Sequence, residues 1–224
     1  MLHLNTGIGI EQTRDFVRDT TKSWGVELRE YKASEYIQAD GKPAPQKYSE
    51  MVMEYGFPGP AMHTKMYIRL KERPLRKAIR DLDRDRKDKT LLVTGVRSEE
   101  SIRRTAHVEP VQIWEGTKIW AAPIWDFTKN DVEDYIDEYG LERNLVVANM
   151  HMSGECLCGA FAKPDEIEEI RFWYPETAAY IERLQDEAET AGVPAVWGVS
   201  PPKKAKVEEP SVAEGLLCSS CVGE

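Results

Sequence analysis

The segment Thr90–Thr94, with the sequence Thr-Leu-Leu-Val-Thr, constrains the fold more than any other part of the chain. Five residues that favour β-structure follow one another and stop abruptly at Gly95, which predicts a short buried strand. Apolar strands of this kind are typical of parallel sheets whose two faces are covered by helices. We therefore expect an α/β fold with a mostly parallel sheet and helices on both of its faces.

Strand-like and helical segments alternate along the first part of the chain. Leu2–Leu4 and Val26–Tyr31 are typical of short strands, and Gln12–Trp24 between them has the apolar spacing of a helix. Met62–Arg86 is also periodic, but it contains Pro74, which cannot continue a helix without losing a hydrogen bond. We expect two helices there that meet just before the proline.

The second half of the chain has clear turn and capping signals. Val111–Trp114 and Lys118–Pro123 flank a Glu-Gly pair and are typical of a hairpin or of two short strands. Thr128 is a good N-cap for a helix over Lys129–Tyr139, which Gly140 would end. Further helices are expected at Tyr48–Tyr55, Asp165–Phe172 and Glu176–Ala191.

Length and charge exclude several classes of protein. The chain has 224 residues, enough for one domain with a C-terminal appendage. No apolar run approaches the ~20 residues that a membrane span needs, and no secretory signal opens the chain, so we expect a cytoplasmic protein. The formal net charge of −9 gives no global reason to expect nucleic acid as a partner, because phosphate binding needs a basic surface.

The composition changes near residue 198. Residues 1–198 are expected to form one α/β domain, whereas residues 199–224 are expected to form a linker and a tail that carries a Cys-x-x-Cys pair. All four cysteines lie in two close pairs, Cys156 with Cys158 and Cys218 with Cys221. In a cytosolic protein such pairs indicate metal or redox sites more often than structural disulfides.

Four segments follow one another in a recognisable order. They are His3–Phe16, Thr94–Arg104, Ala122–Ile136 and Met152–Cys158. The first is similar to a strand end in Asp-Thr-Gly followed by Glu-Thr-Arg-x-Phe, and the second to Gly-x-Arg-x-x-Glu-Ser-x-x-Arg. Together they resemble the phosphoadenosine phosphosulfate (PAPS) reductase-like family of the adenine nucleotide alpha hydrolase superfamily.

The resemblance implies an adenine nucleotide (phospho)sulfate held at the C-terminal ends of parallel strands, where helix N-termini also favour anions. Glycines there let the backbone approach the ligand, and arginines supply forked donors for phosphate or sulfate. The expected nucleotide-binding residues are Asn5, Thr6, Gly7, Gly95, Arg97, Arg103 and Arg104. The alternative for the arginines is surface pairing with Glu99, Glu100 and Glu109.

Two departures from the family pattern stand out. The family places a Ser-Gly-Gly-x-Asp-Ser phosphate loop before the first of these segments, and we expect it upstream of Met1 in the true gene product. Alternatively, a partner supplies the loop, or the activity is lost. The second departure is His63, where relatives often carry cysteine.

The cysteines could hold a metal centre. Four thiolates complete a [4Fe–4S] cluster or a tetrahedral zinc site, and the resemblance favours the cluster. The expected ligands are Cys156, Cys158, Cys218 and Cys221. The alternatives are unligated thiols or a redox-active disulfide.

A PAPS reductase also needs one accessible thiolate to attack the sulfate sulfur, and Cys221 near the chain end is the expected nucleophile. In that case His63 or His151 would complete the metal site. The family resemblance also implies a thioredoxin-like electron donor.

Two rival functions remain open. The first is an ATP-pyrophosphatase-type sulfurtransferase like the DNA phosphorothioation component, under which nucleic acid would be a partner. The second is a non-catalytic, metal-stabilised subunit that keeps the fold alone. The sequence thus predicts a PAPS reductase-like enzyme of sulfur metabolism, an oxidoreductase or a sulfurtransferase. The phosphorothioation-type sulfurtransferase and the non-catalytic subunit are the two alternatives.

Overall fold

The computed structural model describes residues 1–35, 47–82, 88–100, 109–114, 118–163 and 165–198. Its contacts divide the chain into two units: the first is Met1–Ala78 with Asn144–Ala213, and the second is Ile79–Arg143 with Glu214–Glu224. The predicted boundary at residue 198 falls where the described residues end, so it stays a prediction. None of the helices in the described residues combines the length and apolar composition that crossing a membrane requires.

The first unit is built around a parallel pair of strands. Strand β1 (Leu2–Asn5) pairs with β2 (Arg29–Lys32), and helix α1 (Glu11–Ser23) lies between them in the sequence. The register places Asn5 opposite Lys32, so the two carboxyl ends lie side by side. The predicted strand–helix–strand unit is confirmed.

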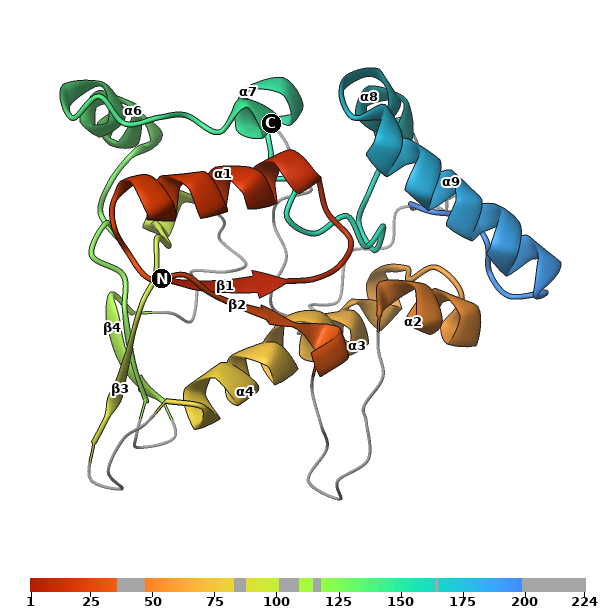
Figure 1. Ribbon diagram of the computed structural model, residues 1–224, viewed down its shortest axis with the longest axis horizontal. Helices are drawn as coiled ribbons and strands as arrows, with labels where there is room; N and C mark the ends of the chain where they lie inside the picture. Colours follow the sequence, from red (N-terminus) through yellow and green to blue (C-terminus); the bar gives the residue numbers. More distant parts are fainter. Residues whose placement is uncertain (36–46, 83–87, 101–108, 115–117, 164, 199–224) are drawn as a thin grey trace, which may run out of the picture. The chain divides into compact units, whose positions relative to one another are not determined.

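One helical segment lies on the other side of these strands from α1 (Figure 1). It consists of α3 (His63–Tyr67), a π-helical turn (Ile68–Glu72) that packs on β1, and α4 (Arg73–Arg80). The prediction of two helices that meet before Pro74 is confirmed. Proline has no N–H to donate, and the wider turn lies at the place where the regular hydrogen-bond ladder is interrupted.

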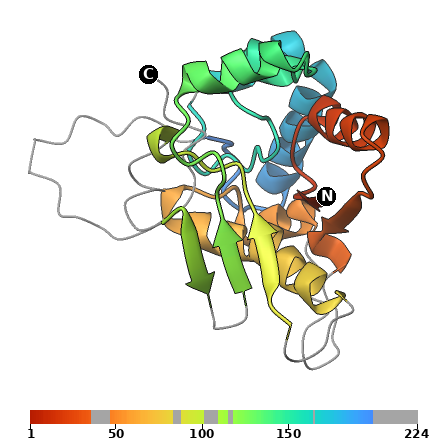
Figure 2. The ribbon, with the colours of Figure 1, turned by 90° about the vertical axis from the view of Figure 1, so that its left-hand side faces the viewer.

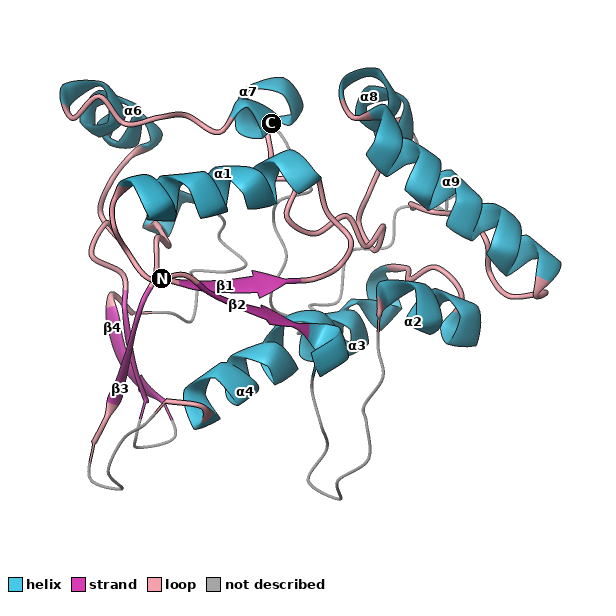
Figure 3. Ribbon diagram, in the orientation of Figure 1, coloured by secondary structure: helices cyan, strands magenta, loops and turns pink. Residues whose placement is uncertain are grey.

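Among the described residues, four further α-helices belong to the first unit (Figure 3). Three match the sequence predictions: α2 (Tyr48–Tyr55), α8 (Glu166–Trp173) and α9 (Pro175–Thr190). The fourth, α7 (Leu145–Met150), was not predicted, because its six residues are too few to show a helical period. Its N-cap is Asn144, whose side-chain oxygen accepts a hydrogen bond from the Val146 N–H.

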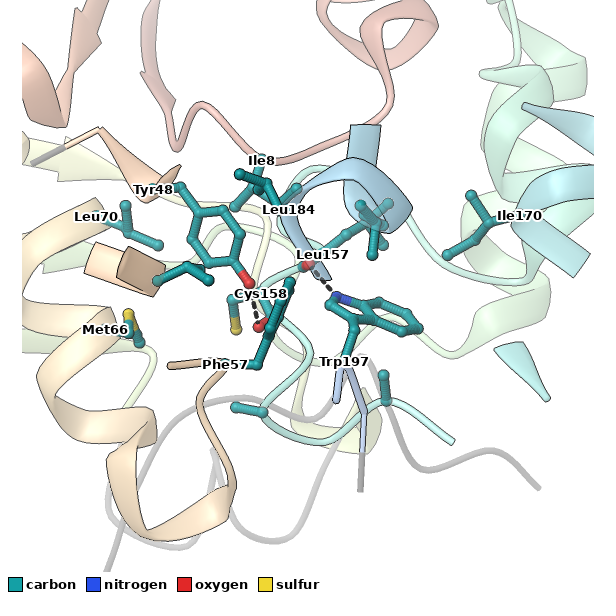
Figure 4. Packing of buried hydrophobic residues seen from close by; sticks show 14 of the residues in the cluster. Ile8, Tyr48, Phe57, Met66, Leu70, Leu157, Cys158, Ile170, Leu184 and Trp197 are labelled. Atoms are coloured by element: carbon teal, nitrogen blue, oxygen red, sulfur yellow. Dashed lines mark hydrogen bonds between the residues drawn. The ribbon is translucent and has the colours of Figure 1, made fainter. Parts of the chain in front are cut away.

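A buried hydrophobic core joins these helices to the loops (Figure 4). Helix α9 packs against α2 and α8, so its apolar face is covered along its length. Fully buried members of the core include Ile8, Met51, Ile170, Ile181 and Leu184. Burial of such a side chain contributes roughly 1.5–3 kcal/mol, which makes this cluster the main source of stability in the unit.

The residues that follow β1 lie side by side with residues 153–158. The Ile10 N–H donates a hydrogen bond to the Gly154 carbonyl at 2.8 Å, and the Leu157 N–H donates to the Ile8 carbonyl at 2.9 Å. These backbone bonds connect segments almost 150 residues apart in sequence. The end of β1 and the turn with the first cysteine pair are therefore held together.

Gly9 marks the closest approach between these two segments. A Cβ atom at this position would lie 2.5 Å from the Glu155 carbonyl oxygen and 2.8 Å from that of Gly154. The Thr6 hydroxyl donates to the same Glu155 oxygen at 2.9 Å. The absence of a side chain at Gly9 is what lets the two backbones meet.

The second unit contains a three-stranded sheet (Figure 2). Strand β5 (Lys118–Ala121) lies in the middle, parallel to β3 (Thr90–Val93) and antiparallel to β4 (Val111–Trp114). The predicted hairpin is thereby confirmed, as is the α/β class. Two of the three strand pairings described are parallel, and they are divided between two separate sheets.

The prediction that Thr90–Thr94 forms a buried strand is wrong in one respect. The strand forms, but the side chain of Leu91 is 57% exposed and that of Val93 is 64% exposed. These alternate residues face the same side of the sheet, whereas Thr90 on the other face is buried. A short apolar run has the same appearance in sequence whether one face or both faces of its strand are covered.

Helix α6 (Lys129–Glu138) begins with the predicted cap. The Thr128 hydroxyl accepts a hydrogen bond from the Asp131 N–H at 3.1 Å, and the Thr128 N–H donates to the Asp131 carboxylate at 2.7 Å. This reciprocal arrangement satisfies two N–H groups that a helix start otherwise leaves without a partner. Gly140 follows the helix with a left-handed φ of 58°, as the sequence predicts.

We predict that Gly9→Ala destabilises the first unit by about 1–3 kcal/mol, because the added methyl group would overlap backbone atoms. Gly59→Ala is the matched control, since a Cβ there meets nothing within 4 Å, and it should change stability by less than about 0.5 kcal/mol. Urea unfolding of the two variants measures the difference. Equal stabilities would show that the close approach does not hold this turn in place.

Candidate functional site

A pocket of about 210 Å³ lies where β1 and β2 end. Ligands in open α/β sheets bind outside the carboxyl ends of parallel strands, so the position is the one expected for a substrate site. The residues that line it come from the end of β1, the end of β2, the start of α2 and helix α9. They are Asn5, Thr6, Gly7, Lys32, Ala33, Ser34, Lys47, Tyr48, Ser49 and Tyr180.

The three predicted nucleotide-binding residues at the end of β1 therefore line one pocket. Asn5 and Thr6 are buried, and their side chains are already engaged within the protein. The Asn5 side-chain oxygen accepts a hydrogen bond from the Gly7 N–H at 2.9 Å, and the Thr6 hydroxyl oxygen accepts one from the Ile8 N–H at 3.4 Å. These two side chains shape the turn, and Gly7 adopts the left-handed φ of 75° that the turn requires.

The carboxylate of Glu30 lies beside this turn and is charged at neutral pH. Burial raises its pKa, but hydrogen bonds from Asn5 and Arg18 outweigh burial and bring the pKa below its ordinary value. The Asn5 amide donates to this carboxylate at 2.8 Å, and the Arg18 guanidinium donates at 3.1 Å. Glu30 therefore stabilises the end of β1 from outside the pocket lining.

Tyr48 connects the pocket with the cysteine turn. Its ring is almost fully buried, and its hydroxyl donates a hydrogen bond to the Cys158 carbonyl at 2.8 Å (Figure 4). Burial raises the pKa of Tyr48 well above its ordinary value, and the neighbouring thiols add to this, so the hydroxyl stays protonated and keeps donating. On the other side of the turn, the Trp197 indole N–H donates to the Leu157 carbonyl at 2.8 Å.

The cysteine turn is held by hydrogen bonds on both of its sides. Cys156 is half-buried and Cys158 is buried. Gly154 and Gly159 on either side of them have left-handed φ values of 63° and 84°, which is the tight bend expected from the sequence. Cys158 belongs to the buried core and Cys156 packs against it, in the turn that contacts the residues after β1.

No group of three His, Cys, Asp or Glu side chains among the described residues is placed to hold a metal ion. His63 is buried with its ring 4.9 Å from that of Phe161, and His151 ends α7 in a left-handed conformation. Neither histidine joins both Cys156 and Cys158 in such a group. The other predicted ligands, Cys218 and Cys221, lie outside the described residues, so the metal centre stays a prediction.

The remaining predicted nucleotide-binding residues belong to the second unit. Gly95 follows β3, and a Cβ there would meet only the Ile124 side chain, at 3.9 Å. The Arg97 guanidinium lies 3.5 Å from the Glu100 carboxylate and donates to the Phe127 carbonyl at 3.5 Å. Glu100 is one of the three acidic partners that the sequence left open as the alternative for the arginines. Arg103 and Arg104 lie outside the described residues, and nucleotide contact by all four stays a prediction.

Sequence analysis missed Lys32 and Lys47, which also line the pocket. Lys32 is the last residue of β2, and Lys47 immediately precedes α2. The signal for Lys32 was its position at the end of a strand parallel to β1. Lys47 had no comparable signal, since only the tertiary structure brings the start of α2 to the strand ends.

Comparisons with known proteins identify a family. A family model described as the phosphoadenosine phosphosulfate reductase domain matches residues 1–152, whereas no curated protein gives a significant match. Among solved structures, the chain is similar to PAPS reductase from Candida auris in a phosphate complex. The sequence identity is 17% and the TM-score is 0.46, and the likeness covers 67% of this chain and 65% of that one.

The family follows from this model, because its match extends over more than half of the chain, from β1 to the end of α7. Three of the four segments that suggested this family from the sequence lie within the matched range, and the fourth, Met152–Cys158, begins at its last residue. The protein belongs to the phosphoadenosine phosphosulfate reductase domain family.

Proposed function

We propose that this protein acts on an adenine nucleotide phosphosulfate and uses cysteine chemistry on its sulfur atom. The observation that carries the proposal is the hydrogen-bonded contact between the strand-end residues of the pocket and the turn with Cys156 and Cys158. Membership in the PAPS reductase domain family supports a nucleotide sulfate of sulfur metabolism as the substrate. A site of this kind needs an anion pocket and a thiol in the same region of the fold.

The proposed reaction is reduction of the sulfate group. The Cys221 thiolate attacks the sulfur atom, an S–S bond forms, and the S–O bond to the 5′-phosphate breaks, so that the nucleotide leaves with the bridging oxygen. A thioredoxin-like dithiol then attacks the Cys221 sulfur and displaces sulfite. The second thiol of the donor completes the exchange, which returns Cys221 to the thiol and leaves the donor as a disulfide.

Gly7 and its neighbours, Asn5 and Thr6, would form one wall of the nucleotide site, with Asn5 and Thr6 acting through the turn that they stabilise. The family resemblance also implies Gly95, Arg97, Arg103 and Arg104 as nucleotide-binding residues. Arginine is suited to this role because its planar fork matches the geometry of phosphate and sulfate oxygens.

We further propose a [4Fe–4S] cluster, with zinc as the alternative, held by Cys156, Cys158, Cys218 and Cys221. The hydrogen-bonded turn that holds Cys156 and Cys158 close together supports it, because thiolates are the preferred ligands of both centres. When bound, a cluster would supply electron or sulfur transfer. If Cys221 is a ligand, it is not available as the nucleophile, and the two roles can be separated by experiment.

The reaction is tested by incubating the full chain with PAPS or adenosine 5′-phosphosulfate and a reduced dithiol. We expect sulfite release and, without the dithiol, a sulfonate adduct on Cys221 detected by peptide mass spectrometry. Cys221→Ser should abolish both, whereas Ser219→Ala, two residues away, should leave both unchanged. If neither sulfite nor an adduct forms with either nucleotide, reduction by this protein is excluded under these conditions. Pyrophosphate release from ATP would then favour the sulfurtransferase, and absence of nucleotide binding would favour the non-catalytic subunit.

The metal centre is tested by anaerobic purification and metal analysis. About four iron atoms per chain and a broad visible absorption are expected for the cluster, and Cys156→Ser should lower the iron content at least severalfold. Ser153→Ala, in the same turn, is the control and should retain the iron. One zinc atom per chain in a colourless preparation would show that the centre is zinc and not an iron–sulfur cluster. A preparation that contains neither metal would leave the cysteines as thiols or as a disulfide.

A further inference from the structure

The lining of the pocket at the ends of β1 and β2 has a charge opposite to that of the chain. Among the residues that the structure describes, the lining has ten members, which include two lysines, Lys32 and Lys47, and no aspartate or glutamate. The whole chain has 39 acidic and 30 basic residues, which gives the net charge of −9. Two cations without a carboxylate in the lining, on so acidic a chain, favour an anionic ligand.

Lys32 is available for such a ligand. Its ammonium lies 3.8 Å from the Glu30 carboxylate, at the limit of an ion pair, and its side chain is 49% exposed. That carboxylate already accepts hydrogen bonds from Asn5 at 2.8 Å and Arg18 at 3.1 Å. Lys32 is therefore the most distant of these three partners of Glu30, and its exposed ammonium can also reach a ligand.

Lys47 has a similar position on the opposite wall. It is exposed and immediately precedes α2, and its backbone N–H donates to the Glu50 carboxylate at 3.2 Å. The Glu50 carboxylate is thus engaged by the backbone of Lys47. Within the described part of the chain, the Lys47 ammonium makes no ion pair. The positive end of α2 adds to the attraction of Lys47 for an anion.

Hydroxyl groups and size narrow the ligand class. Ser34 also lines the pocket and can donate to oxyanion oxygens, whereas the Ser49 hydroxyl is hydrogen-bonded to Tyr180. Burial raises the pKa of Tyr180, so its hydroxyl stays protonated and can also donate. The volume of about 210 Å³ is below the roughly 300–1,000 Å³ of pockets that enclose drug-sized molecules. The space suits one tetrahedral oxyanion and part of its carrier.

We infer that this pocket is the subsite for one phosphate or sulfate group of the nucleotide, held by Lys32 and Lys47. The inference rests on the proposed function, because the anion would be part of the nucleotide substrate. The group has two sources with the same chemistry, the 5′-phosphosulfate end and a phosphate on the ribose. Both are tetrahedral oxyanions for which lysine ammonium groups act as compact point charges.

The test measures binding by calorimetry at one ionic strength with Lys32→Gln, Lys47→Gln and the double variant. The probes are adenosine 3′,5′-bisphosphate, AMP, adenosine and inorganic sulfate. Each single variant should weaken binding of the bisphosphate about tenfold or more, and the double variant further, because each removes a charge-assisted contact. Adenosine, which carries no anion, should bind all variants equally.

Lys22→Gln is the matched control, because it makes the same charge change in the last turn of α1, outside the pocket lining. It should bind every probe like the wild type. A loss seen with the bisphosphate but not with AMP assigns the subsite to the ribose phosphate, whereas a loss with both assigns it to the 5′ group. Unchanged binding of all anionic probes by the double variant, or an equal loss in Lys22→Gln, would overturn the inference.

The same measurements separate this inference from the proposed function. If the wild type binds no nucleotide, the proposed function fails, and inorganic sulfate decides the subsite. Sulfate binding that the double variant loses and Lys22→Gln retains supports the anion subsite by itself. If the wild type binds neither nucleotide nor sulfate, the anion subsite is rejected. If nucleotides bind equally well to all variants, the proposed function stands and the subsite is wrong.

Discussion

The backbone contact between the residues after β1 and the turn at 153–158 is the constraint on which the first unit depends. It joins the strand end that borders the pocket to the segment that carries Cys156 and Cys158. The contact requires a glycine at position 9, because any Cβ there would overlap two carbonyl oxygens. The pocket and the turn that carries two cysteines, although distant in sequence, are thereby joined by hydrogen bonds.

The polar side chains around the pocket are of two kinds: some make hydrogen bonds within the protein, and others are exposed. Asn5 and Thr6 use their hydrogen-bonding groups on the protein itself, since a buried polar group without a partner would be costly. Lys32 and Lys47 remain on the exposed side, where a ligand can reach them. Tyr48 belongs to both the pocket and the core, and through its hydroxyl the pocket wall is connected to the cysteine turn.

Sequence reasoning succeeded where the signal is local. The cap at Thr128 and the break before Pro74 depend on neighbouring residues and were predicted correctly, as was the hairpin. It failed for the burial of Leu91 and Val93, because an apolar strand does not reveal which of its faces will be covered. Helix α7 was missed because six residues give no measurable period.

The sequence by itself determined the α/β class, most helices and strands, and the family, because these depend on periodicity, turn residues and the order of short motifs. It also indicated Asn5, Thr6 and Gly7 as candidate nucleotide-binding residues at the end of a strand. Only the tertiary structure decided that this strand end faces Lys32 and Lys47 across a pocket and contacts the cysteine turn. Contacts between segments so far apart depend on packing in three dimensions, for which the linear pattern carries no signal.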